Sequence, residues 1–281
     1  MIIVTGVKGQ LGYDVVKELN KRNIPCKGID IEDLDITDGN AVMSYITSEN
    51  PEAVIHCAAY TAVDKAEDDV EKCTAVNVNG TENIALACKK IGAKMMNFST
   101  DYVFPGGGEK EYEIGDEKAP QSVYGRTKLE GEYKVIENVD KHFIVRISWV
   151  FGVNGNNFVR TMLRLSETKT ELNVVCDQIG SPTYTADLAP LVCDMIVTEK
   201  YGIYHATNEG FCSWAEFARA IFEIAGKTVK VNSVASSEYP VKAKRPLNSR
   251  LSKRELDMAG FGRLPKWKDA LKRYLAELNL K

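Results

Sequence analysis

Short apolar runs alternate with stretches of helical periodicity over roughly the first 150 residues. After the first run, for example, Leu11, Val15, Val16 and Leu19 recur at helical spacing. Runs that suit buried strands lie at residues 2–4, 26–29, 53–59, 95–98 and 143–147. Regular alternation of strands and helices is typical of a parallel sheet with helices on both faces. The pattern therefore predicts an α/β fold with a doubly wound parallel sheet of the Rossmann type.

The alternation becomes less regular after residue 152. A turn-rich segment covers residues 177–183, and an amphipathic helix is expected from about Trp267 to Leu278. No linker, repeat or low-complexity segment separates the two parts. We predict a dinucleotide-binding Rossmann domain over residues 1–152, with some later segments packing back on it. Residues 153–281 are expected to form a smaller C-terminal substrate-binding domain.

Composition narrows the class of protein. The 281 residues are 44% hydrophobic, enough for a sizeable core. A net charge of -3, with 36 basic and 39 acidic residues and no basic stripe, argues against a nucleic-acid partner. We find no basic leader and no run of 18 apolar residues, and so expect a cytoplasmic protein without a membrane partner.

Cysteines and histidines give no metal signature. The seven cysteines are odd in number and lack C-x-x-C spacing, so we expect them to behave as small apolar side chains. His56, His142 and His205 are scattered in or beside strand-like runs, which suits structural roles better than a zinc site or a catalytic triad.

A glycine-rich turn joins the first strand to the first helix. Its spacing is G-x-x-G-x-x-G, which departs from the commoner G-x-G-x-x-G. Glycines there permit a tight turn and bring backbone N–H groups close to a pyrophosphate at the helix N-terminus. The alternative is an ordinary strand-to-helix turn. Cofactor-binding residues expected in this turn are Gly6, Lys8, Gly9, Gln10, Leu11 and Gly12.

The second strand ends in Asp30, a position from which a carboxylate can accept hydrogen bonds from an adenosine ribose 2′-OH. That favours NADH, whereas Lys8 suits the 2′-phosphate of NADPH, so the sequence leaves both cofactors open. Asp35 and Ile36 are expected beside the adenine, unless they only precede a helix starting at Thr37. Further expected cofactor neighbours are Ala58, Ala59, Tyr60 and Asn77.

Tyr124 and Lys128 lie four residues apart and hence on one helix face. An ammonium near a phenol favours the phenolate, so the pattern predicts a lowered pKa for Tyr124 and a proton donor usable near neutral pH. A solvated pair on a surface helix is the alternative. The pair follows an apolar strand that opens onto Ser99, Thr100, Asp101 and Tyr102, which favours a catalytic centre.

Taken together, these motifs resemble the extended short-chain dehydrogenase/reductase superfamily and, within it, the dTDP-4-dehydrorhamnose reductase family. The segments at 58–64 and 245–249, and the pairs Asp177-Gln178 and Pro182-Thr183, extend the likeness over nearly the whole chain. The resemblance implies reduction of the 4-keto group of dTDP-6-deoxy-L-lyxo-4-hexulose to dTDP-L-rhamnose by NADPH or NADH. It implies that Thr100 holds the substrate carbonyl, Tyr124 gives the proton and Lys128 holds the nicotinamide ribose.

A dTDP-4-keto-6-deoxy sugar also carries a pyrophosphate, for which Arg245 can supply a planar guanidinium. The alternative is a solvated basic loop formed with Lys242, Lys244 and Arg250. The substrate-binding residues that we expect are Asp101, Tyr102, Trp149, Asn157, Arg245 and Asn248.

Some members of the family bind Mg²⁺ at a dimer contact through glutamates. Here the matching positions hold Asp14 and Ala186, and alanine has no ligand atom, so no metal ligands are predicted and Mg²⁺ dependence is doubtful. The sequence leaves a monomer and a homodimer equally open.

Two other functions agree less well with the sequence. Sugar-nucleotide dehydratases of the superfamily carry Asp-Glu after the threonine, whereas this chain has Asp101-Tyr102 and lacks the glutamate base; a related epimerase or reductase stays an alternative. A non-catalytic subunit resembling the beta subunit of methionine adenosyltransferase is disfavoured, because Thr100, Tyr124 and Lys128 are all retained.

Overall fold

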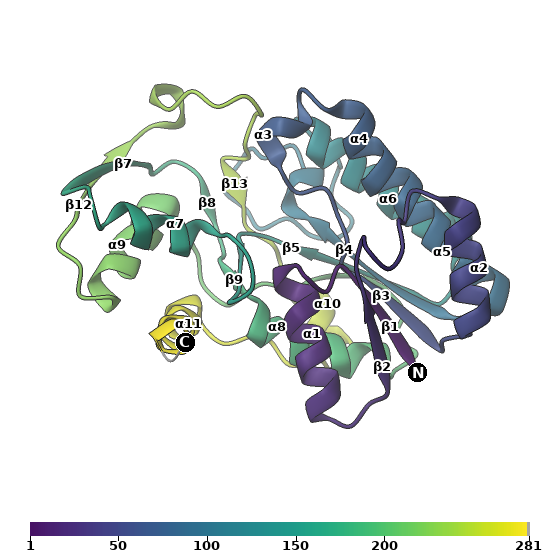
Figure 1. Ribbon diagram of the computed structural model, residues 1–281. Helices are drawn as coiled ribbons and strands as arrows, with labels where there is room; N and C mark the ends of the chain where they lie inside the picture. The colour runs from purple at the N-terminus through teal and green to yellow at the C-terminus, as the bar shows by residue number, and fades with distance from the viewer. Residues whose placement is uncertain (280–281) are drawn as a thin grey trace.

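The computed structural model describes residues 1–279, which are built around one six-stranded sheet (Figure 1). Its strands lie in the order β10-β5-β4-β3-β1-β2, and every neighbouring pair is parallel. Their bounds are β1 (Ile2–Thr5), β2 (Cys26–Ile29), β3 (Ala53–His56), β4 (Lys94–Thr100), β5 (His142–Ile147) and β10 (Gly202–His205). The predicted α/β fold with a doubly wound parallel sheet is confirmed.

The order of the strands reverses at β1. The chain passes from β1 to β2 on one side and then to β3 on the other. In such sheets the loops that follow the two central strands diverge, leaving a crevice at the carboxyl ends where ligands bind. The glycine turn after β1 and the small residues after β3 meet at this crevice.

Both faces of the sheet are covered, because successive strand residues point to opposite sides. Ile2 and Val4 pack in a core with α1 (Gln10–Lys21) and α8 (Thr185–Ile196). Ile3 packs in another core with α2 (Gly39–Glu49), α5 (Thr81–Ile91) and α6 (Val123–Asn138). This explains why the strands read as continuous apolar runs instead of alternating patterns.

The C-terminal part has its own core around Phe151, Phe217 and Tyr274. Its helices are α7 (Phe158–Leu165), α9 (Trp214–Ile224) and α11 (Trp267–Asn279). Its strand pairs are β7 (Glu171–Val175) with β12 (Lys230–Val234) and β6 (Val150–Phe151) with β9 (Thr183–Tyr184). A three-stranded sheet contains β8 (Ile179–Gly180), β11 (Cys212–Ser213) and β13 (Asn248–Ser249).

The later residues also return to the first sheet. β10 pairs with β5, while α8 and α10 (Arg254–Met258) contribute to the core on one sheet face. The division at residue 152 stays a prediction, but these contacts join the two parts closely. The remaining elements are α3 (Val63–Ala66), α4 (Val70–Thr74), the π-helix η1 (Ala75–Gly80), and the short 3-10 helices η2 (Asp101–Val103) and η3 (Ser236–Glu238).

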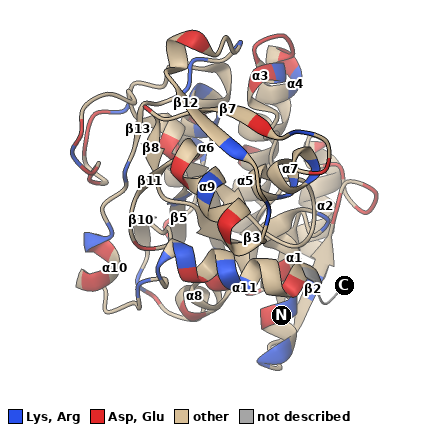
Figure 2. Ribbon diagram, turned by 90° about the vertical axis from the view of Figure 1, so that its left-hand side faces the viewer, with Lys and Arg blue, Asp and Glu red and all other residues tan. Residues whose placement is uncertain are grey.

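Charged residues of both signs are interspersed on the face that Figure 2 presents. No helix within residues 1–279 combines the length and the apolar character needed to cross a membrane. Four of the cysteines, Cys73, Cys88, Cys193 and Cys212, are buried as thiols, and the other three are half-buried.

Candidate active site

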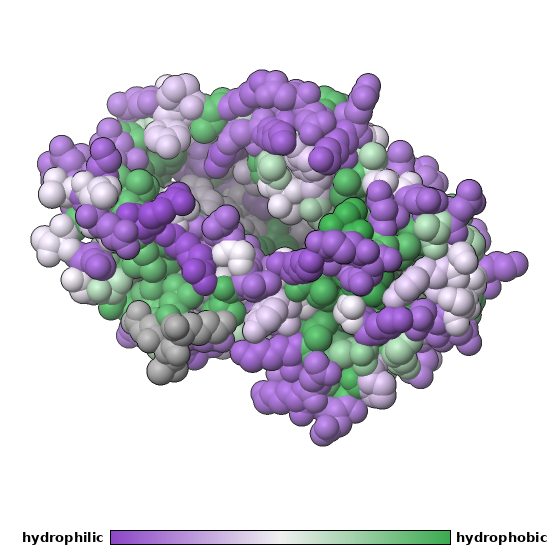
Figure 3. Space-filling view, viewed as in Figure 1, coloured by the Kyte–Doolittle hydropathy of each residue, from purple (hydrophilic) through white to green (hydrophobic). Residues whose placement is uncertain are grey.

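A cavity of about 870 Å³ opens at the carboxyl ends of β1, β3 and β4, where the sheet order reverses. The molecule is visibly hollowed there in Figure 3. Most of the residues predicted for cofactor and catalysis line the cavity. They are Gly6, Lys8, Gly9, Gln10, Leu11, Gly12, Asp30, Asp35, Ile36, Ala58, Ala59, Thr100, Tyr124 and Lys128.

Two glycines of the turn are required by its geometry. Gly6 has φ +69°, and a Cβ there would lie 2.7 Å from the backbone N of Ala58. A Cβ on Gly12 would lie 2.4 Å from the Gly6 carbonyl oxygen. Only glycine permits this close approach of the turn to the start of α1. The result is a backbone cradle at a helix N-terminus, which fits the pyrophosphate of a dinucleotide.

The end of β2 is tied to the same turn. Asp30 accepts the Lys8 backbone N–H at 2.8 Å, and the Lys8 ammonium lies 2.6 Å from a Glu32 carboxylate oxygen. Asp30 therefore holds the turn in place in addition to facing the cavity. α2 begins at Gly39 with Asp38 as its cap, so the helix does not start at Thr37.

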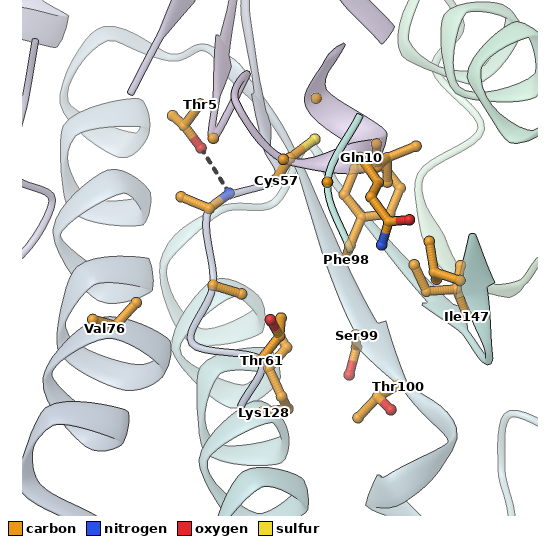
Figure 4. Close-up of a pocket in the computed structure, with 18 of the residues that line it drawn as sticks. Thr5, Gln10, Cys57, Thr61, Val76, Phe98, Ser99, Thr100, Lys128 and Ile147 are labelled. Atoms are coloured by element: carbon orange, nitrogen blue, oxygen red, sulfur yellow. Dashed lines mark hydrogen bonds between the residues drawn. The ribbon is translucent and has the colours of Figure 1, made fainter. Parts of the chain in front are cut away.

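The expected catalytic side chains come from two elements that approach closely. Thr100 ends β4, whereas Tyr124 and Lys128 lie on α6, whose N-terminus is capped by Ser122. Figure 4 shows Thr100 and Lys128 on facing elements of the cavity. A Cβ on Gly125 would lie 2.4 Å from the Tyr102 carbonyl oxygen, so glycine at that position lets α6 reach the β4 end.

Tyr124 lies in a buried environment next to Tyr102, with ring centroids 5.4 Å apart in an edge-on arrangement. Burial raises the pKa of Tyr124 above its usual value, and the hydrogen bond with Thr100 opposes the rise only in part. The prediction that Lys128 lowers this pKa is therefore wrong for the protein as it stands, because burial disfavours the phenolate and the hydrogen bond with Thr100, not the Lys128 charge, is what opposes it. The phenol remains protonated near neutral pH and can still donate.

Lys128 is 4% exposed, and its charge is costly to bury. Burial lowers the pKa of Lys128 to about 8, against an opposing effect of Glu132 one turn further along α6. Glu132 in turn binds Arg146 of β5 through two hydrogen bonds of 2.9 and 2.7 Å, both side chains being 1% exposed. This ion pair fixes α6 against the sheet and so places the Tyr124–Lys128 face.

Asn77 and Tyr60 lie beside the cavity instead of lining it. The Asn77 side chain accepts the Tyr60 backbone N–H at 2.8 Å and donates to the Tyr60 carbonyl at 3.1 Å. It also donates to the Thr127 hydroxyl at 3.1 Å. Asn77 thus joins the loop after β3 to α6. It lies in the π-helix η1, and such interruptions of a regular helix are frequent at functional sites.

The predicted substrate residues divide into two groups. Asp101, Tyr102 and Trp149 line the cavity. Asn157 and Asn248 do not: Asn157 caps α7 and bonds to Gln10, and Asn248 donates to the Lys110 carbonyl at 2.8 Å. Both amides lie outside the cavity lining and bond to other groups of the protein. Their contacts with the substrate therefore stay a prediction.

Arg245 lies at a separate small cavity of about 160 Å³ that shares Tyr102 with the large one. Its guanidinium pairs with Asp64 at 2.5 Å and its side chain is 33% exposed. The alternative of a solvated basic loop describes the exposed Lys242 and Lys244, which bond to Asp68 and Gln121, but not Arg245, which is half-buried.

Trp214 was not expected in the site. Its ring stacks on Trp149 with centroids 3.6 Å apart and an angle of 13°. Trp149 has φ +50°, an uncommon conformation for a tryptophan. Trp214 begins α9, some 65 residues after Trp149. The sequence signal beside it is the capping box of Ser213 and Glu216, which predicts the start of a helix but not a binding site.

The position matched to a metal ligand, Asp14, is buried and accepts the Thr185 hydroxyl at 2.5 Å. Within residues 1–279 no group of three or more His, Cys, Asp or Glu side chains is arranged to hold a metal ion.

Comparison with known proteins places this site in a family. The family model described as RmlD substrate binding domain matches residues 1–280. The spore coat polysaccharide biosynthesis protein SpsK of Bacillus subtilis is 41% identical over 98% of this chain and 97% of its own. The dTDP-4-dehydrorhamnose reductase of Escherichia coli is 37% identical over 99% of this chain and 97% of its own.

Solved structures agree over the whole length. The dTDP-4-dehydrorhamnose reductase of Clostridium acetobutylicum is 43% identical, with a TM-score of 0.97 over 99% of both chains. That of Bacillus anthracis, solved in complex with NADP, is 42% identical with a TM-score of 0.96 over 98% of both. A Thermus thermophilus UDP-glucose 4-epimerase, at 19% identity and a TM-score of 0.84, shares the fold alone. The chain therefore belongs to the RmlD family, among whose members are the dTDP-4-dehydrorhamnose reductases.

Proposed function

We propose that this chain reduces the 4-keto group of dTDP-4-dehydro-L-rhamnose to give dTDP-L-rhamnose, with NADPH or NADH as the reductant. The observation that carries the proposal is the convergence of Thr100, Tyr124 and Lys128 on one cavity at the end of β4. The NADP complex of the Bacillus anthracis relative supports the same cofactor class.

The cradle of Gly6 and Gly12 would hold the cofactor pyrophosphate, with Asp30 at the adenosine ribose and Lys128 at the nicotinamide ribose. When bound, the nicotinamide would supply the hydride that reaches C4 of the sugar. The chain's own residues then complete the reaction at the carbonyl oxygen.

Tyr124 gives its phenolic proton to the developing alkoxide, and Thr100 donates a hydrogen bond to the same oxygen. Lys128 places positive charge beside the phenolate that Tyr124 becomes, which lowers the cost of the proton transfer. The buried surroundings strengthen these interactions because little water competes with them.

The other functions fit the site less well. Tyr102 occupies the position where a dehydratase needs its glutamate, and its buried phenol has a pKa raised above the usual value, so it is a poor base. A non-catalytic subunit would have no need for three converging catalytic side chains. A cytoplasmic location and a monomeric or homodimeric state stay predictions of the sequence.

Turnover of the sugar nucleotide tests the proposal. Purified protein should consume NADPH or NADH when dTDP-4-dehydro-L-rhamnose is added, and dTDP-L-rhamnose should appear in equal amount by chromatography. The control is the protein with dTDP-L-rhamnose alone. Reductant that is not consumed, or a product other than the 4-hydroxy sugar, would contradict the proposed reaction.

A further inference from the structure

Asp101 is a buried carboxylate at the edge of the cavity, directly after Thr100. It is 2% exposed. One oxygen accepts the Thr100 hydroxyl at 3.0 Å, and the other makes a short hydrogen bond with the hydroxyl of Ser249. Ser249 lies on β13 of the C-terminal part and is also 2% exposed. A residue 148 positions away thus completes the surroundings of the catalytic threonine.

The direction of these hydrogen bonds follows from counting protons. An ionised carboxylate can only accept, so both Ser249 and Thr100 must donate to it. Thr100 has a single hydroxyl hydrogen. While that hydrogen points to Asp101, the Thr100 oxygen can only accept, from the Tyr102 backbone N–H at 3.3 Å and in its hydrogen bond with Tyr124. In that arrangement Thr100 has no proton for a substrate carbonyl.

A protonated Asp101 reverses the direction. The acid then has one O–H, which can donate to the Thr100 oxygen, while its other oxygen still accepts from Ser249. The Thr100 hydrogen is released to point into the cavity. One additional donor at the developing oxyanion is worth roughly 10²–10³ in rate in enzymes where such donors have been removed.

We propose that Asp101 and Ser249 are positioning residues that set the direction of the Thr100 hydrogen bond, so that Thr100 donates to the substrate carbonyl only when Asp101 carries a proton. The inference rests on the proposed function, because it assumes that Thr100 binds the reacting carbonyl. It assigns Asp101 a role through Thr100 and gives Ser249 a role in the reaction.

The electrostatic surroundings make such protonation accessible. Tyr102 of the same turn and Tyr124 of α6 face Asp101 as neutral phenols, and Ser249 faces it from β13. Arg245 and Asp64, which pair with each other, act on the neighbouring Tyr102 with opposite signs. Burial raises the pKa of Asp101 to about 6, against the hydrogen bonds from Ser249 and Thr100, which lower it.

The sign of the pH dependence follows. The protonated form is the active one, so kcat/KM for the sugar nucleotide should fall as the pH rises through the Asp101 pKa, by about tenfold per pH unit until activity with one donor remains. A second fall belongs to Lys128, whose pKa burial lowers to about 8. The two falls can be separated because different variants move them.

Asp101→Asn is the decisive variant, because an amide permanently imitates the protonated acid. Its oxygen can accept from Ser249, and its NH₂ can donate to Thr100. The first fall should disappear from its kcat/KM profile, measured at saturating NADPH between pH 5 and 9, while the Lys128 fall remains. Ser249→Ala removes a donor that favours the carboxylate, so it should move the first fall to higher pH.

Ser252→Ala is the matched control, since Ser252 is also buried and lies three residues further along, where its carbonyl bonds to His205. Its profile should superimpose on that of the unaltered protein. An Asp101→Asn profile that keeps the first fall would overturn the inference. So would a folded but inactive Asp101→Asn protein together with an unshifted Ser249→Ala profile. Absence of turnover in the unaltered protein would instead reject the proposed function itself.

Discussion

The side-chain oxygen of Gln10 accepts a hydrogen bond from the Asn157 amide at 3.0 Å, across a separation of 147 residues. The same oxygen accepts the Gly152 backbone N–H at 2.8 Å. Asn157 also donates to the Tyr274 hydroxyl of α11 at 3.0 Å. Gln10, at the end of the glycine turn, is thus bonded directly to the loop before α7 and, through Asn157, to the last helix.

We expect Asn157→Ala to weaken cofactor binding although Asn157 does not line the cavity. The variant loses the cap of α7, worth about 1 kcal/mol, and leaves Gln10 without one of its donors. The Kd for NADPH, measured by fluorescence titration, should rise about threefold to tenfold. Asn232→Ala, a half-buried amide on β12, should leave the Kd unchanged.

A double-mutant cycle isolates the contact. Gln10→Ala and Asn157→Ala combined should weaken NADPH binding by less than the sum of the two single effects, with a coupling free energy of about 0.5–1.5 kcal/mol. Strictly additive effects would mean that the two residues act on the cofactor independently.

Tyr124→Phe should lower kcat by about 10²-fold or more while the Kd for NADPH stays nearly the same. The phenyl ring preserves the packing on Tyr102, so only the proton donor is lost. Tyr133→Phe on the exposed side of the same helix is the control and should turn over normally. An unaltered kcat in Tyr124→Phe would reject Tyr124 as the acid.

Local patterns in the sequence were sufficient to predict that the glycine turn, Thr100, Tyr124 and Lys128 lie at one cavity, because each position depends on a strand end or on one helix face. Contacts between distant segments left no such signal. Neither the stacking of Trp214 on Trp149 nor the ion pair of Arg245 with Asp64 follows from spacing along the chain. They depend on how the C-terminal part packs against the sheet.

The prediction of a lowered pKa for Tyr124 failed for a related reason. Sequence spacing places Lys128 on the same helix face, but the extent of burial is set by Tyr102 and by elements that pack around α6. Desolvation is a property of the folded site, and here it acts against the phenolate more strongly than the hydrogen bond with Thr100 favours it. A motif alone therefore predicts the residues of the site better than their ionisation.

Cofactor preference is expected to depend on Glu32 as well as on Asp30 and Lys8. The Lys8 ammonium is paired with Glu32 at an exposed position, which reduces its availability to a 2′-phosphate. Glu32→Ala should therefore raise the ratio of kcat/KM for NADPH to that for NADH by about twofold to fivefold, the scale of a surface ion pair.

Asp30→Ala should shift the same ratio toward NADPH, and both cofactors should support turnover in the unaltered protein. Because Asp30 also accepts the Lys8 N–H, this variant should raise the KM for both cofactors, whereas Glu32→Ala should not. If the ratio of kcat/KM for NADPH to that for NADH changes in neither variant, the end of β2 does not distinguish the 2′-OH of the ribose from a 2′-phosphate.

Arg245 is expected to meet the substrate pyrophosphate, and the structure shows what competes for it. Its Nη2 lies 2.5 Å from Asp64, which also accepts the Ala243 backbone N–H at 3.1 Å and so anchors the loop. A phosphate must therefore share the guanidinium with Asp64 or displace it. The half-buried position at a cavity that shares Tyr102 with the large one makes such a contact possible without unfolding the loop.

Arg245→Ala should raise the KM for the sugar nucleotide by about tenfold to a hundredfold, the scale of a lost charge-assisted hydrogen bond, and leave the KM for NADPH almost unchanged. Arg245→Lys should restore the affinity only in part, because an ammonium cannot bind two phosphate oxygens as a planar fork does. Arg263→Ala is the control, since Arg263 forms an ion pair with Asp257 away from both cavities. If the KM for the sugar nucleotide is the same in Arg245→Ala and Arg263→Ala, then Arg245 serves only to hold the loop against Asp64, and the pyrophosphate is bound elsewhere.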